Sequence, residues 1–125
     1  MKYSELLVWQ KAMDLVEQVY RVTRTFPPDE RFGLTSQTQR AAVSIPSNIA
    51  EGHGRKSTGA FQNHLSVATG SLMELETQVQ IAERLGFLSE AECGSILKRT
   101  DEISRMLSGL RASLSARSSI LDPRS

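Results

Sequence analysis

The sequence predicts an all-α protein, an antiparallel up-down-up-down four-helix bundle, and three observations lead to this prediction. Apolar residues recur at steps of three and four along four separate stretches, as the buried face of an amphipathic helix requires. No stretch alternates polar and apolar residues over the length of a strand. The connections are short, which favours antiparallel neighbours. We assign residues 1–117 to the bundle and expect residues 118–125 to form a flexible C-terminal tail.

The first predicted helix spans residues 4–26. It ends before Pro27 and Pro28, because proline has no backbone N–H to donate and restricts the residue before it. The helical spacing predicts one buried stripe along this segment. That stripe consists of Trp9, Ala12, Met13, Val16, Val19, Tyr20, Thr23 and Phe26.

The second predicted helix begins with Thr35 as its N-cap and runs to about Gly52. Pro46 lies inside this segment, where it removes the backbone hydrogen bond to the carbonyl of Ala42. Because the apolar residues keep helical phase on both sides of the proline, we expect a kink near residues 44–47 without loss of the helix. The apolar face consists of Leu34, Ala41, Ala42, Ile45 and Ile49.

Residues 52–59, Gly-His-Gly-Arg-Lys-Ser-Thr-Gly, form the clearest linker in the chain. The third predicted helix follows and runs to about Leu85, with Gly86 as its C-terminal cap. The fourth begins where Ser89 and Glu92 stand in capping-box register. Both helices have unbroken apolar stripes: Phe61, Leu65, Ala68, Leu72, Leu75, Val79 and Ala82 on the third, and Cys93, Ile96, Thr100, Ile103, Leu107, Leu110 and Leu114 on the fourth.

Composition and charge indicate an ordinary globular domain. Fifteen basic and fourteen acidic side chains leave a formal charge of +1, a weak footprint for a nucleic-acid binder, whose domain pI usually exceeds about 9. The apolar run at residues 6–9 is too short for a signal peptide or a membrane span, so we expect a cytoplasmic protein without membrane contact. The lone Cys93 lies on an apolar stripe, where a small buried hydrophobe is expected.

The sequence contains no pattern that favours catalysis, a metal site or a cofactor, so we expect a protein that is not an enzyme. A di-iron bundle needs Glu-x-x-His pairs, but Glu51 and His53 are two residues apart, and His64 has no carboxylate three or four residues before it. Residues 54–57, Gly-Arg-Lys-Ser, lack the glycine before lysine that a Walker loop requires. This segment either holds a phosphate at the start of the third helix or is only a flexible connection, which is the favoured interpretation.

A stripe of polar residues runs beside the apolar face of the second helix: Gln37, Arg40, Ser44, Asn48 and Glu51. These side chains border the core closely enough to be partly buried, and buried polar groups need hydrogen-bond partners. Arg40 and Glu51 would supply charge-assisted bonds, including one to each other. Two interpretations stay open: a hydrogen-bonded seam inside the bundle, or a subunit interface that uses the same residues for specificity.

The polar stripe lies within a longer motif, residues 37–52, whose letters are QTQRAAVSIPSNIAEG. Together with residues 9–12, 32–35 and 70–76, this motif resembles the family of four-helix-bundle proteins named for the intervening sequences of 23S ribosomal RNA. The resemblance covers residues 6–114. It implies a homopentameric ring without established enzymatic activity. Relatives that accompany the reverse transcriptases of diversity-generating retroelements imply association with nucleic acid.

Two classes of function follow from these observations. The first is a non-enzymatic homo-oligomer that associates with RNA or DNA through basic patches. The second is an oligomeric scaffold that recognises another protein. The resemblance favours the first, whereas the near-zero charge favours the second. So does Gln39, which stands where the family often has a further basic residue. A second departure is His64, where the family often has an aromatic residue.

Candidate contact residues can be named for both assembly and nucleic acid. Apolar residues away from the core face of the third helix, Val67, Met73 and Ile81, predict a second contact surface and hence a homo-oligomer. Nucleic-acid binding would be independent of base sequence, because it would depend on phosphate contacts. The predicted binding residues are Arg40, Arg55, Lys56, Arg105, Arg111 and Arg117.

Overall fold

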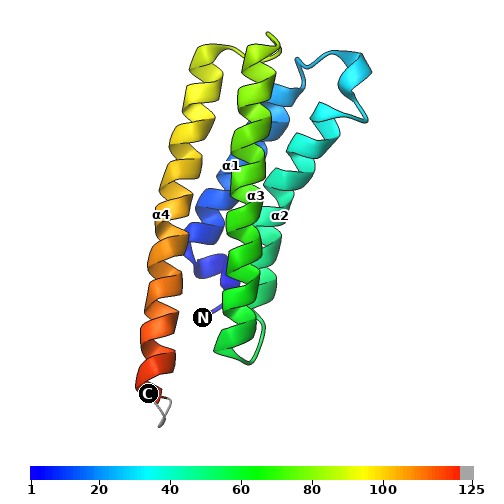
Figure 1. Cartoon of the computed structure of the whole chain (residues 1–125). Helices are drawn as coiled ribbons and strands as arrows, with labels where there is room; N and C mark the ends of the chain where they lie inside the picture. The colour runs from blue at the N-terminus through cyan, green and yellow to red at the C-terminus, as the bar shows by residue number, and fades with distance from the viewer. Residues whose placement is uncertain (122–125) are drawn as a thin grey trace.

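The computed structural model describes the backbone of residues 1–121 and the side chains of residues 1–117. Figure 1 shows its long helices side by side: α1 (Leu7–Thr23), α2 (Leu34–His53), α3 (Thr58–Arg84) and α4 (Glu90–Leu121). Two short 3-10 helices, η1 (Tyr3–Glu5) and η2 (Pro28–Glu30), precede α1 and α2. No strand occurs in residues 1–121, so the all-α prediction is confirmed.

The helices form a square in which α1 and α3 each pack against α2 and α4. Bonds between helices show that neighbours run in opposite directions. Lys11 pairs with Glu102, and Gln18, further along α1, bonds Ser95, which lies earlier on α4. Pairs in the same reversed order join α2 to α3 and α3 to α4: Ser44 with Ser71, Asn48 with His64, Gln62 with Arg111 and Val79 with Cys93.

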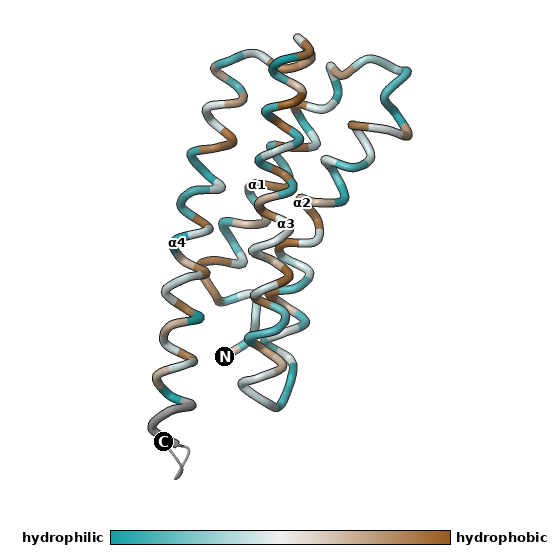
Figure 2. Tube along the Cα trace, in the orientation of Figure 1, coloured by the Kyte–Doolittle hydropathy of each residue, from teal (hydrophilic) through white to brown (hydrophobic). Residues whose placement is uncertain are grey.

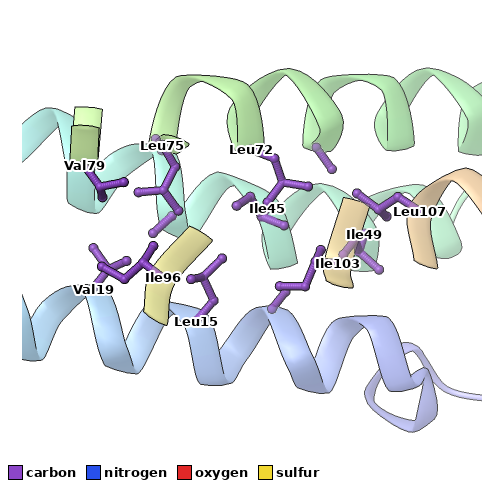
Figure 3. Packing of buried hydrophobic residues seen from close by; sticks show 14 of the residues in the cluster. Leu15, Val19, Ile45, Ile49, Leu72, Leu75, Val79, Ile96, Ile103 and Leu107 are labelled. Atoms are coloured by element: carbon purple, nitrogen blue, oxygen red, sulfur yellow. The ribbon is translucent and has the colours of Figure 1, made fainter. Parts of the chain in front are cut away.

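The core runs through the middle of this square. Figure 2 shows hydrophobic residues recurring along each helix between hydrophilic ones, and Figure 3 shows how the largest of them meet. Each such side chain stabilises the fold by roughly 1.5–3 kcal/mol when it leaves water. The side chains labelled in Figure 3 are at most 1% exposed: Leu15, Val19, Ile45, Ile49, Leu72, Leu75, Val79, Ile96, Ile103 and Leu107.

The buried stripe of α1 differs from the predicted one. Two members of the predicted stripe, Met13 and Tyr20, are 38% and 43% exposed, and Trp9 and Val16 are only half-buried. The prediction was wrong for these residues because α1 has two apolar stripes side by side, and periodicity alone does not show which one faces the core. The stripe against the core consists of Val8, Ala12, Leu15, Val19 and Val22.

The ends of the first two helices also differ from prediction by a few residues. α1 begins at Leu7 because the residues before it form η1, and it ends at Thr23. α2 begins at Leu34, with Gly33 as its N-cap residue, so Thr35 lies inside the first turn and does not cap the helix. The N–H of Gly33 donates to the carbonyl of Glu30 at 2.9 Å, which places the end of η2 directly before α2.

α2 continues as one helix through Pro46, as predicted. Ala42, Ile45 and Ile49 on both sides of the proline are fully buried, so the apolar stripe keeps its phase. Burial of this face offsets the cost of a proline in a helix, which is about 3 kcal/mol. The kink near residues 44–47 stays a prediction.

The signals at the α3–α4 connection act as predicted. Gly86 has a φ of +79°, and its N–H donates to the carbonyl of Glu83 at 3.0 Å. The next N–H, of Phe87, donates to the carbonyl of Ala82 at 2.9 Å, which completes a Schellman cap. α4 then begins with the capping box, in which the N–H of Glu92 donates to Ser89 Oγ at 3.0 Å.

The backbone of α4 is helical to Leu121, four residues beyond the domain boundary predicted at residue 117. The rest of the predicted flexible tail, residues 122–125, lies outside the described residues. Within the described part of the chain, no helix is both long and apolar enough to cross a membrane.

Candidate interaction surfaces

The middle of the polar stripe on α2 closes against α3 through hydrogen bonds. Asn48 Nδ2 donates to the Ser44 carbonyl at 2.8 Å and to Ser44 Oγ at 3.1 Å. The Ser71 hydroxyl on α3 donates to Ser44 Oγ at 2.8 Å. Asn48 Oδ1 lies 3.0 Å from Nδ1 of His64, also on α3. The structure therefore places Ser44 and Asn48 in a hydrogen-bonded seam inside the bundle, which we call the α2–α3 seam.

A close approach of the two helices at Gly52 allows this seam to form. A Cβ at Gly52 would lie 2.7 Å from Cβ of His64 and 3.0 Å from Cδ1 of Phe61. No ordinary side chain fits at such distances without movement of α3. The absence of a Cβ at this buried position lets the ring of His64 reach Asn48. His64 is therefore a structural member of the seam that sequence reasoning missed.

Glu51 pairs with Arg55, not with Arg40. Nη2 of Arg55 donates to Glu51 Oε1 at 2.8 Å, and Nε2 of His64 lies 4.0 Å from the same oxygen. The predicted bond between Arg40 and Glu51 was wrong, because eleven residues of helix separate them by about 16 Å. The spacing of Glu51 and Arg55, four residues with the acid first, is the signal that predicts the observed pair.

Gln37 and Arg40 are exposed and do not take part in the seam. They line an open groove of about 570 Å³ between α2 and α3, together with Ala41, Ser44, Val67, Ser71, Glu74 and Gln78. Arg40 and Glu74 give this groove one charge of each sign. Oε1 of Gln78 is buried there and has no hydrogen-bond partner among the residues whose side chains are described.

Four of the predicted nucleic-acid-binding residues lie at one end of the bundle. Arg55 and Lys56 are in the α2–α3 connection, and Figure 1 shows that the last turns of α4, which contain Arg111 and Arg117, extend to the same end. Gln62 Nε2, one turn after the start of α3, donates to the Arg111 carbonyl at 2.8 Å and so joins these segments. Lys56 and Arg117 are exposed.

The other two predicted residues lie away from that end. Arg105 is further back along α4, and its Nη2 pairs with Asp101 at 2.8 Å. Arg40 is in the first half of α2, in the groove described above. Because Arg105 and Arg55 each have a carboxylate partner, part of the charge that the sequence suggested is already neutralised within the chain.

The second apolar stripe of α1 lines a groove against α2, which we call the apolar groove. Its volume is about 380 Å³, and the rings of Tyr3 and Trp9 meet edge to face at one side, with centroids 5.4 Å apart. Its walls consist of Tyr3, Trp9, Met13, Val16, Val43, Pro46, Ser47 and Ala50. On α3, the predicted off-core residues Val67, Met73 and Ile81 are 52%, 46% and 42% exposed.

Cys93 is buried, and its thiol lies 3.7 Å from the carbonyl oxygen of Val79. Burial, followed by the hydrogen bond and the charge of Glu83, raises the pKa of Cys93 to about 11. The thiol therefore stays protonated at neutral pH and is a poor nucleophile. Among the described residues, no group of three His, Cys, Asp or Glu side chains could hold a metal ion.

The fold and the α2–α3 seam define the class of protein, a four-helix bundle with a hydrogen-bonded seam between α2 and α3. The model of the 23S rRNA-intervening sequence protein family matches residues 4–109, and the chain belongs to this family. A crystal structure from Bacteroides thetaiotaomicron, described as a protein with unknown function from the S23 ribosomal protein family, is similar in fold. The two structures superpose with a TM-score of 0.78 at 22% sequence identity, and the match covers 84% of this chain and 98% of that chain. No curated protein matches the chain.

Proposed function

We propose that this protein is a non-enzymatic cytoplasmic protein that assembles as a homo-oligomer and associates with RNA in its assembled form. The observation that supports the proposal best is the presence of two exposed apolar surfaces on different elements. One is the apolar groove between α1 and α2. The other, the α3 stripe, consists of Ile81 and Leu85, which lie one turn apart on the exposed side of α3 at its end.

The shapes of these two surfaces favour contact between copies. The apolar groove is concave, and the α3 stripe is the convex side of a helix, so the stripe of one copy can enter the groove of the next. Two different patches in contact make a head-to-tail interface, which closes into a ring when the rotation between copies allows. The family resemblance supports a ring of five.

Assembly also supplies the charge that RNA association requires. One subunit has a formal charge of only +1, and Arg55 is paired with Glu51. A ring repeats Lys56, Arg111 and Arg117 once in every subunit, so that several phosphates can be contacted at the same time. The description of the family, which names an rRNA intervening sequence, supports RNA as the partner.

Light scattering at micromolar concentration tests the assembly. We expect one species whose mass is a whole multiple of 13.8 kDa, with five as the expected number. Oligomers of another size would change the ring but not the proposal. A sample containing only the 13.8 kDa monomer would contradict it.

Filter binding with RNA at 50 mM and 200 mM salt tests the association. The double variant Arg55→Ala with Lys56→Ala should bind more weakly and show a flatter dependence on salt, since phosphate contacts release counterions. The matched control is Arg24→Ala with Arg84→Ala, which removes the same charge from two exposed residues elsewhere. An equal loss of affinity in both double variants would show that Arg55 and Lys56 have no special role in RNA binding.

The α2–α3 groove favours a second candidate, an oligomeric scaffold that recognises another protein. Arg40 and Glu74 present both charges, and the buried Oε1 of Gln78 has no partner within the described side chains, so a polar protein surface would suit this groove. No detectable RNA binding at 50 mM salt, a condition that favours phosphate contacts, would make this scaffold the better proposal.

A further inference from the structure

A second basic site lies between α1 and α4, apart from the residues considered so far. A cleft of about 290 Å³ is lined there by Lys11 on α1 and by Ser95, Lys98, Arg99, Glu102 and Ile103 on α4. Lys98 and Arg99 lie three and four residues after Ser95 and four and three residues before Glu102, so α4 presents all four on one side. None of these residues is among the nucleic-acid-binding residues predicted from the sequence.

The cleft has more positive than negative charge. Lys11 Nζ lies 2.8 Å from Glu102 Oε1, and the two side chains are 39% and 52% exposed. The hydrogen bond and charge of Lys11, and more weakly the charge of Arg99, lower the pKa of Glu102, which is therefore ionised at neutral pH. Lys98 and Arg99 have no ion-pair partner among residues 1–117. Three cations and one carboxylate leave a surplus of two positive charges, in a chain whose total is +1.

A buried glutamine orients an uncharged hydrogen-bond donor, the Ser95 hydroxyl, in the same cleft. Gln18 is only 8% exposed, and its Nε2 donates to Ser95 Oγ at 2.9 Å. Since the Ser95 oxygen already accepts this bond, its own proton is free to be donated into the cleft. Oε1 of Gln18 is buried and has no partner among the described side chains.

We infer that the α1–α4 cleft is a phosphate-binding site, in which Lys11, Lys98 and Arg99 surround the anion and the Ser95 hydroxyl donates to it. Phosphate suits this set because its several oxygens accept charge-assisted bonds from different directions, and a guanidinium can bind two of them together. The inference rests on the proposed function only in taking RNA as the source of the phosphate. A small phosphate compound has the same chemistry, and the experiment distinguishes the two.

The first measurement is the affinity of the full chain for a single-stranded RNA across 50–200 mM salt. Loss of two phosphate contacts in the Lys98→Ala, Arg99→Ala double variant should reduce the slope of log K against log salt by about 1.4. The matched control is again Arg24→Ala with Arg84→Ala, which lose the same charge outside the cleft. Its slope should stay close to that of the original protein.

A gain in affinity separates a binding role from a structural one. Glu102→Gln removes the carboxylate and frees Lys11 from its ion pair, so RNA should bind about twofold to fivefold more tightly. If the Lys11–Glu102 pair only joined two helices, this variant would not bind RNA more tightly. Light scattering of each variant shows whether the assembly is unchanged.

Titration with inorganic phosphate, followed by the backbone amide resonances of Ser95 and Lys98, completes the test. If RNA binds and the cleft variants weaken this binding more than the control does, the result supports both the phosphate site and RNA as the source of the phosphate. If RNA does not bind but phosphate shifts these resonances only in the original protein, the site stands with a small phosphate as ligand, and the proposed function falls. If RNA binds and the cleft variants match the control, the site is overturned and the function survives. Absence of both responses overturns both.

Discussion

The two sides of α2 that flank its buried stripe meet their neighbours in opposite ways. Toward α3, Ser44 and Asn48 are bonded to Ser71 and His64 over distances of 2.8–3.0 Å. Toward α1, apolar side chains line an open groove, and Val43 is still 40% exposed. From Ser44 to Asn48 the polar side of this helix is therefore closed within the chain, although it opens into a groove at Arg40, whereas the apolar side is open.

This difference indicates separate roles for the two sides. Hydrogen bonds have fixed lengths and hold helices close together only where the backbone permits it, which is why Gly52 lies in the seam. Apolar contacts have no preferred direction, and large side chains such as Trp9 leave space between α1 and α2. We interpret the polar side as part of the folding core and the apolar side as a surface for assembly.

The largest expected effect on stability comes from Gly52→Ala. The new Cβ would lie 2.7 Å from Cβ of His64, so α3 must shift, and overpacking of this kind costs about 1–3 kcal/mol. The control is Gly94→Ala, also in a helix, where a Cβ meets nothing within 4 Å and should stabilise by up to about 1 kcal/mol. Urea unfolding measures both. Equal stabilisation by the two changes would show that the helices are not tightly closed at Gly52.

A smaller loss is expected for Asn48→Ala, which leaves His64 and Ser44 without their shared partner. The free energy of unfolding should fall by about 1–2 kcal/mol relative to Asn63→Ala. Asn63 is exposed on α3, so its replacement changes helix propensity in the same way without removing a described bond. Similar stabilities for the two variants would mean that the seam contributes little to folding.

The pH dependence of stability tests the buried α3–α4 contact at Cys93. The folded state raises the pKa of this thiol from 9.0 to about 11, so its contribution is complete below pH 9 and is lost as the pH rises toward 11. At pH 10 the loss is about 1 kcal/mol relative to neutral pH. Unfolding of Cys93→Ala should lack this part of the alkaline loss. Parallel pH profiles for both proteins would contradict the assignment.

Signals within a few residues of each other predicted much of the fold. Pro27, Gly86 and the Ser89–Glu92 box mark helix ends through bonds that reach no further than one turn, and the structure has these ends within a few residues. Thr35 does not cap α2, because the helix already begins at Leu34 with Gly33 as its N-cap residue. The prediction of the core face of α1 was wrong because both apolar stripes of this helix satisfy the same periodicity.

The candidate sites depended more on contacts between distant segments. His64 joins the seam only because α3 lies against Gly52 and Asn48, and the cleft residues Lys11 and Arg99 are nearly ninety positions apart in the chain. The spacing of neighbouring residues in the sequence does not predict such pairs. The exception is the ion pair of Glu51 with Arg55, which their four-residue spacing predicts. Arg40 is eleven residues from Glu51, too far along the helix to pair with it.

The smallest change in folding should come from Val43→Glu, and this variant tests the central claim most directly. Val43 is exposed in the apolar groove, so the charge should alter the stability of the folded subunit by no more than about 0.5 kcal/mol. A charge buried without a partner at a copy-to-copy interface would prevent assembly. Light scattering should therefore show the full oligomer for the original protein and a folded 13.8 kDa monomer for Val43→Glu. An unchanged oligomer would contradict the role of the apolar groove in assembly.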